Sequence, residues 1–159
     1  MISLRAMGPH DRSAVAEVWH EGWHDAHAAH FPDALINARG PEAFAAAVSR
    51  MSRPVTVAEV GGDVPGFVII DDDTVDRLFV ARRARGTGVA QALLRAAENE
   101  IAKAGHPTGY LDYVDGNARA ARFYEKEGWR VVKRGPDTIE LPNGGEAAYT
   151  QVICAKALK

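Results

Sequence analysis

The chain has 159 residues, of which 47% are hydrophobic and 25% are charged, and its formal net charge is −2. This length and composition predict a single globular domain over residues 1–159, and the lack of a basic excess argues against nucleic-acid binding. No apolar run reaches membrane-spanning length, and the N-terminus lacks a signal-peptide pattern. Cys154 is the only cysteine, so no disulfide can form within the chain. We therefore expect a cytoplasmic protein without membrane contact.

The first third of the chain predicts one strand followed by helices. Residues Ile2–Ala6 read as a strand, and Pro9 opens a helix whose apolar residues recur with the helical period. The helical pattern continues over Trp23–His30 and stops at Phe31–Pro32. A second helix is predicted from Pro41 to about residue 51, because proline is favoured in the first helical turn.

Four histidines gather in the first helical segment. His20, His24, His27 and His30 are spaced by four, three and three residues, so the first three share one face of a helix. Imidazoles at this spacing can bind zinc, but the segment has no HExxH motif and no cysteine partner. An ordinary surface or core helix explains the same pattern.

The middle of the chain predicts a hairpin, a third strand and a long helix. Val55–Val60 and Val64–Ile70 alternate as strands around a Gly-Gly-Asp turn, and Val75–Val80 reads as the next strand. A glycine loop, Arg82–Ala90, then leads into a helix that runs to about residue 104 and buries one apolar face.

The glycine loop is suited to binding an anion. Gly86 and Gly88 permit a tight turn and a close approach to the backbone, and the first amides of the following helix lack partners within the helix. Together with Arg83 and Arg85, these amides form a candidate phosphate or pyrophosphate site. A P-loop would need Lys-Ser/Thr after the glycines, and a dinucleotide-binding loop would need a third glycine where Gln91 stands. A tight turn without a ligand is the structural alternative.

The last third predicts three strands around one helix. Thr108–Val114 is a strand, Asn117 is a suitable N-cap for the next helix, and Gly128 is suited to end it in a left-handed conformation. Residues 129–133 and 147–155 are the last strands, with a turn over residues 143–145. The element order predicts an α/β fold with a single mixed, mostly antiparallel sheet and helices on both faces.

Two motifs in the loop and the last helix resemble those of the GCN5-related N-acetyltransferase (GNAT) family. The loop reads Arg83-x-x-Gly86-x-Gly88, and the later segment opens at Asn117 and ends Phe123-Tyr124-Glu-Lys-Glu-Gly-Trp. The resemblance implies the acyl-CoA N-acyltransferase fold, in which the strands on either side of the loop and its helix splay apart. It also implies acetyl-CoA as co-substrate, no metal, and a possible homodimer.

The implied activity is acetyl transfer to a primary amine of a small molecule by direct attack in a ternary complex. A protein N-terminal or lysine acetyltransferase and a non-catalytic acyl-CoA-binding domain are the alternatives that share the fold. A nucleotide-binding switch is a third class, and the missing Lys-Ser/Thr argues against it.

The resemblance assigns residues to the donor. Tyr124 is the candidate general acid, because a phenol stays protonated at neutral pH and can donate to a thiolate; pairing with Phe123 in the core is the structural alternative. Asn117 caps its helix and is a candidate CoA contact. The other candidate acetyl-CoA-binding residues belong to the strand, the loop and the same helix: Leu78, Phe79, Val80, Arg83, Arg85, Gly86, Thr87, Gly88, Val89, Ala90, Phe123 and Tyr124 itself.

The general base is the less defined role. Family members often carry a glutamate on the strand before the loop, and the nearest acid here is Asp76, which regular alternation would place on the same face as Leu78 and Val80. An ion pair with Arg77 is the alternative use of this residue. The resemblance also places the first helical segment along the acceptor pocket, with His27 where many members have tyrosine. His24 or His27 is therefore a second candidate base.

Overall fold

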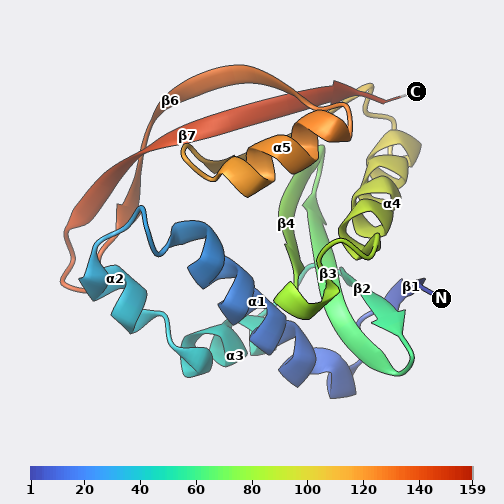
Figure 1. Ribbon diagram of the computed structural model, residues 1–159, viewed down its shortest axis with the longest axis horizontal. Coiled ribbons are helices and arrows are strands. Elements are labelled where there is room, and N and C mark those ends of the chain that lie inside the picture. Colours follow the sequence, from blue (N-terminus) through green and yellow to red (C-terminus); the bar gives the residue numbers. More distant parts are fainter. Residues whose placement is uncertain (159) are drawn as a thin grey trace.

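A computed structural model describes residues 1–158 and contains one seven-stranded sheet with helices on both faces, which confirms the predicted fold class (Figure 1). No helix among these residues is long and apolar enough to span a bilayer. The strands are β1 (Ser3–Ala6), β2 (Val55–Val60), β3 (Asp63–Asp71), β4 (Thr74–Val80), β5 (Thr108–Val114), β6 (Arg130–Glu140) and β7 (Glu146–Ala157). The helices are α1 (Arg12–His27), α2 (Asp33–Ala38), α3 (Pro41–Ser49), α4 (Val89–Lys103) and α5 (Ala118–Lys126), with short 3-10 turns η1 (Pro9–Asp11) and η2 (Arg82–Ala84).

The centre of the sheet is interrupted between β4 and β5. The strand order is β1-β2-β3-β4-β5-β7-β6, and only β4 and β5 run parallel to each other. These two strands share a single register pair, Thr74 with Tyr110, beside which the Tyr110 amide donates to the Asp73 carbonyl at 3.0 Å. Beyond that pair the strands diverge, as the resemblance implied, and the resulting gap lies in the middle of the molecule.

The sheet separates two apolar cores because its side chains alternate between faces. Phe67 and Ile69 of β3 pack on the side of α1 and α3, where the Trp19 ring lies 6.0 Å from the Phe67 ring. Val68 packs on the opposite side with Leu93 and other apolar residues of α4. Figure 1 shows α1, α2 and α3 together on one side of the central strands and α4 and α5 on the other.

A β-bulge in β4 breaks the expected alternation at Asp76. Arg77 pairs with Ile69 of β3 and Val75 pairs with Ile70, so Asp76 is the extra residue between two register pairs. A bulge re-aims the side chains around it and bends the strand. The shared face predicted for Asp76, Leu78 and Val80 therefore does not follow from strand geometry, because regular alternation ends at the bulge.

Two elements differ from the sequence prediction. Helix α2 was not predicted, because its six residues are too few to show a helical period. Strand β6 was predicted to end near residue 133, but it continues to Glu140 by pairing along β7. The interior Pro136 is tolerated because β6 is an edge strand of the sheet.

Candidate functional site

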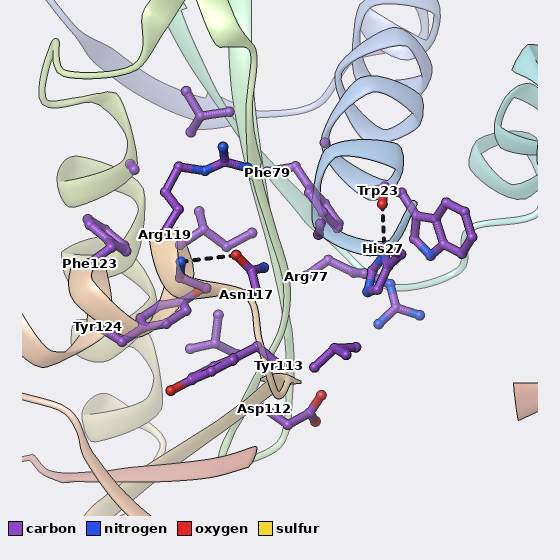
Figure 2. A pocket seen from close by; sticks show the side chains of 18 of the residues that line it. Trp23, His27, Arg77, Phe79, Asp112, Tyr113, Asn117, Arg119, Phe123 and Tyr124 are labelled. Carbon is purple, nitrogen blue, oxygen red and sulfur yellow. Dashed lines mark hydrogen bonds between the residues drawn. The ribbon is translucent and has the colours of Figure 1, made fainter. Parts of the chain in front are cut away.

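A cleft of about 700 Å³ runs through the gap between β4 and β5. It begins at the loop before α4, passes between β4 and α5, and ends against α1 and the β6–β7 hairpin. Figure 2 shows this arrangement, with His27 and Trp23 of α1 on one side and Tyr124 and Phe123 of α5 on the other. The predicted residues Leu78, Phe79, Val80, Arg85, Gly86, Gly88, Ala90, Asn117, Phe123, Tyr124, Asp76 and His27 all line it.

The loop before α4 presents backbone amides to this cleft. Gly86 and Gly88 have positive φ angles of 77° and 91°, which L side chains rarely adopt. A Cβ atom on Gly86 would meet nothing within 4 Å, so the space above the loop is open. No side chain caps the first turn of α4, whose amides form the positive end of a 15-residue helix. This geometry fits an anionic group such as a pyrophosphate.

The two arginines predicted for the pyrophosphate point in different directions. Arg85 lines the cleft, whereas Arg83 turns away and pairs with Asp63 of β3 at 2.8 Å. Thr87 and Val89 also lie outside the cleft lining: the Thr87 hydroxyl donates to the Ala84 carbonyl, and Val89 is buried in the core.

Asp25 of α1 connects the acceptor-side helix to the loop. Its carboxylate accepts hydrogen bonds from Arg82 at 2.6 Å and from Arg85 at 2.6 Å. The Arg82 hydrogen bond, with that of Arg85, lowers the pKa of Asp25 to about 2, so the carboxylate is ionised at neutral pH. The bridge fixes the direction in which the Arg85 guanidinium enters the cleft.

Arg119 is a cation that the sequence reasoning missed. It lies in the first turn of α5 and lines the cleft. Burial, and then the charge of Arg85, lower the pKa of the Arg119 guanidinium, so the two cations lie close enough to repel each other. The signal in the sequence was its position two residues after the helix cap Asn117. Arg85 and Arg119 are charged groups that could hold a diphosphate above the α4 amides.

Tyr124 is held on the cleft wall by the ends of its helix. The Asn117 side chain accepts a hydrogen bond from the Ala120 amide at 3.2 Å, and Gly128 ends the helix with a φ angle of 92°, as predicted. The Tyr124 ring stacks on Tyr113 of β5, with ring centroids 6.1 Å apart (Figure 2). Burial raises the pKa of the Tyr124 phenol, so its hydroxyl is a proton donor at neutral pH.

His27 faces the other end of the cleft as a neutral imidazole. Its Nδ1 lies 2.8 Å from the Trp23 carbonyl oxygen (Figure 2), and because a carbonyl only accepts, Nδ1 carries the proton. The lone pair is then on Nε2. The ring stacks on Phe31 at 5.2 Å. Burial lowers the pKa of His27 to about 4, so Nε2 is a free acceptor at physiological pH.

The other three histidines of the first helical segment, His20, His24 and His30, are not part of the cleft lining. His24 Nε2 contacts the Arg39 carbonyl at 2.5 Å, and the His20 ring packs on His24 at 4.5 Å. His30 is exposed. Among residues 1–158, no three His, Cys, Asp or Glu side chains come together as a set of metal ligands. The structure thus gives His24 a role in anchoring the segment after α2, and it brings only His27 to the cleft.

Two carboxylates line the cleft near its α1 end. Asp76 is bound in ion pairs to Arg53 at 3.0 Å and to Arg77 at 3.4 Å, which matches the structural alternative for this residue. Asp112 of β5 was not predicted, although strand alternation places it opposite Tyr113 and away from α5 (Figure 2). Its side chain keeps contact with solvent, but the surrounding protein raises the pKa of the Asp112 carboxyl.

Several solved structures are similar to this chain, and most of them are described as established or putative acetyltransferases. A GCN5-related N-acetyltransferase from Rhodopseudomonas palustris has 25% sequence identity and a TM-score of 0.75, covering 98% of this chain and 95% of that one. PaiA N-acetyltransferase from Thermoplasma acidophilum, solved in complex with coenzyme A, has 19% identity and a TM-score of 0.71 over 99% of both chains. YncA from Salmonella typhimurium, solved with its cofactor acetyl-CoA, has 19% identity and a TM-score of 0.70, covering 100% of this chain and 95% of that one.

The sequence itself matches a family model. No curated protein sequence matches the chain. The model of the acetyltransferase (GNAT) domain matches residues 52–131, which is half of the chain and spans β2 to β5, the glycine loop, α4 and α5. This chain therefore belongs to the GNAT acetyltransferase family.

Proposed function

We propose that this protein is an acetyl-CoA-dependent N-acetyltransferase that acts on a primary amine of a small molecule. The observation that carries the proposal is one continuous cleft, which joins the open amides before α4 to the pocket beside α1 and passes Tyr124 on the way. Two similar proteins of nearly the same length were solved with coenzyme A or acetyl-CoA. Membership of the acetyltransferase family supports the same donor here.

The chain offers two binding regions for acetyl-CoA. The α4 amides with Arg85 and Arg119 suit the pyrophosphate. Beyond Thr74, β4 has no register partner on β5 among the described residues, so backbone groups of Leu78 to Val80 are available to the pantetheine arm. When bound, acetyl-CoA supplies a thioester carbonyl as the electrophile. A β4 amide that faces this carbonyl would stabilise the negative charge that develops on its oxygen.

Two side chains on opposite walls of the cleft have the protonation states that the reaction requires. In our proposal the acceptor nitrogen forms the new bond to the acetyl carbon, and His27 accepts its proton on Nε2. Tyr124 donates its phenolic proton to the sulfur as the carbon–sulfur bond breaks. The low pKa of His27 keeps it unprotonated before the reaction, and the high pKa of Tyr124 keeps it protonated.

An aromatic contact between the end of α1 and the β6–β7 hairpin borders the acceptor end of the cleft, and in our proposal it favours a small molecule over a polypeptide. Phe31, after α1, meets Tyr149 of β7 edge to face, with ring centroids 5.3 Å apart. Tyr149 and Ile139 of the β6–β7 hairpin line the cleft at this end.

The proposal is tested by incubating the protein with acetyl-CoA and a panel of small primary amines. Release of the CoA thiol and a product heavier than the amine by one acetyl group in place of a hydrogen are expected together. A peptide panel with free N-termini and lysines serves as the comparison. Tight acetyl-CoA binding without acetylation of any amine or peptide would instead support a non-catalytic acyl-CoA-binding domain.

A further inference from the structure

Arg39 is a half-buried cation at the acceptor end of the cleft that lacks an anionic partner. Its guanidinium lies over the Trp23 ring, 4.9 Å from the ring centroid, and it lines the cleft. Its backbone carbonyl is held by His24, which fixes the segment that follows α2. No carboxylate within residues 1–158 forms an ion pair with Arg39, although partly buried charges are normally paired.

A second guanidinium approaches the same space from the sheet. Arg77 of β4 lies 5.7 Å from the Trp19 ring centroid, and Figure 2 shows its side chain extending toward His27. Its one ion pair is a 3.4 Å contact with the adjacent Asp76, which Arg53 also binds. Burial, and then the charge of Arg77, lower the pKa of the Arg39 guanidinium, so the two cations act on each other. Both cations also act on His27.

The opposite wall of this space carries a negative group. Asp112 of β5 lines the cleft, and its nearest charged neighbours include Arg77 and Asp76. The acceptor end is therefore polarised. Arg39 after α2 and Arg77 of β4 lie on one side, where Asp76 pairs with Arg77 but not with Arg39, and the Asp112 carboxylate lies on the β5 side. A ligand that carries both an anion and a cationic or neutral amine complements this arrangement.

We propose, on the basis of the function proposed above, that the acceptor is an amino acid whose carboxylate is bound by Arg39 and Arg77. A guanidinium binds a carboxylate through two parallel hydrogen bonds. The amine of the same molecule then lies toward Asp112, between His27 and the donor. A polyamine would bring further positive charge to the two arginines, and an amino sugar would leave them without an anion. Trp23 and Phe31 provide an apolar surface for the side chain of the amino acid.

The test compares amines that differ only in the carboxylate. The twenty common L-amino acids are assayed beside their carboxamides, with spermidine and glucosamine as amines without a carboxylate. We expect acetylation of at least one amino acid and a kcat/KM at least about 10-fold lower for its carboxamide. Arg39→Gln should lower kcat/KM for the amino acid at least about 10-fold, mainly through KM, and should bring the ratio of the amino-acid kcat/KM to the carboxamide kcat/KM close to one.

Matched controls separate this inference from the proposed function. Arg50→Gln removes an exposed arginine at the end of α3, outside the cleft, and should leave both rates unchanged. Arg39→Lys keeps the charge without the two-pronged geometry and should recover part of the lost activity. Far-ultraviolet circular dichroism confirms that each variant is folded. Three results would overturn the inference while leaving N-acetyl transfer intact. They are equal rates for an amino acid and its carboxamide, a preference for spermidine or glucosamine, and acetylation of peptides alone. Failure to bind acetyl-CoA would overturn the proposed function itself.

Discussion

Replacing Tyr124 with phenylalanine removes the proposed proton donor and little else. The Tyr124 ring contacts Tyr113, Phe123 and Trp129 with centroids 6.1, 5.2 and 6.5 Å apart, and a phenylalanine ring preserves these contacts. The Tyr124 hydroxyl makes no hydrogen bond within residues 1–158 that the substitution would break. We therefore expect the free energy of unfolding to change by less than about 1 kcal/mol.

The expected effect of Tyr124→Phe on catalysis is much larger. General acid catalysis accelerates a reaction by about 100- to 10,000-fold. Because a thiolate leaves fairly readily without a proton, we expect the lower end of this range. The kcat should therefore fall about 100-fold, which corresponds to an activation free energy higher by about 2.7 kcal/mol. The Kd of acetyl-CoA should stay within about twofold, because only a proton donor is lost. Tyr110→Phe, outside the cleft lining on β5, is the matched control. Thiol release under saturating acetyl-CoA measures kcat, and a kcat for Tyr124→Phe equal to that of the control would refute the role of Tyr124.

Three further predictions concern the loop and α1. Asp25→Asn should lower the free energy of unfolding at pH 7 by about 2 kcal/mol, since Arg82 and Arg85 lower the pKa of Asp25 from 3.8 to about 2. The difference in unfolding free energy between the variant and the wild type should shrink as the pH falls below about 4. Urea unfolding measures this difference, and a difference that does not depend on pH would contradict the prediction. His27→Phe should preserve the stacking on Phe31 but lower kcat/KM for the amine. In the wild type we expect kcat/KM to fall as the pH drops through about 4, the pKa of His27, and this fall should be absent from the variant. An unchanged pH–rate profile would exclude His27 as the base. Gly86→Ala should lower the free energy of unfolding by about 1 kcal/mol, because alanine rarely adopts the φ angle of 77° found at this position. The substitution should also weaken acetyl-CoA binding at least about 10-fold, as measured by calorimetry. Binding equal to that of the wild type would mean that the loop does not approach the ligand.

The backbone geometry of the glycine loop and of the start of α5 was predictable because its signals are local. A turn with positive φ requires glycine, a helix start favours Asn, and both constraints act within a few residues of Gly86 and Asn117. The chain order of strand, loop and helix then places the loop at the opening of the sheet. The side chains of Arg83, Thr87 and Val89 were predicted to bind the donor but lie outside the cleft lining. The direction of a side chain depends on partners elsewhere in the chain, such as Asp63 for Arg83.

Which side chains reach the acceptor end of the cleft depends on contacts between segments that are distant in the sequence. Helical spacing placed His24 and His27 on one face, but only the position of the Arg39 carbonyl decides that His24 is bound there. The bulge that re-aims Asp76 has no local sequence signal, since it arises from the register between β3 and β4. Arg39 and Asp112 come together only when α2, β4 and β5 are assembled, so no spacing within the chain could indicate them.

The bridge from Asp25 connects the two halves of the site. Asp25 belongs to α1, whose later residues Trp23 and His27 face the acceptor end, and it holds Arg85 at the donor loop. Ordinary ion-pair chemistry thus links the geometry of the donor loop to the acceptor helix.

The most direct test of the central claim is an acetyl-CoA titration by isothermal calorimetry, with ATP and NAD as controls. The loop before α4 lies at one end of the cleft, and within residues 1–158 the β5-facing edge of β4 has no register pair beyond Thr74. We predict one binding site with micromolar affinity for acetyl-CoA and much weaker binding of ATP and NAD. Absence of acetyl-CoA binding, or equal binding of ATP, would contradict the account.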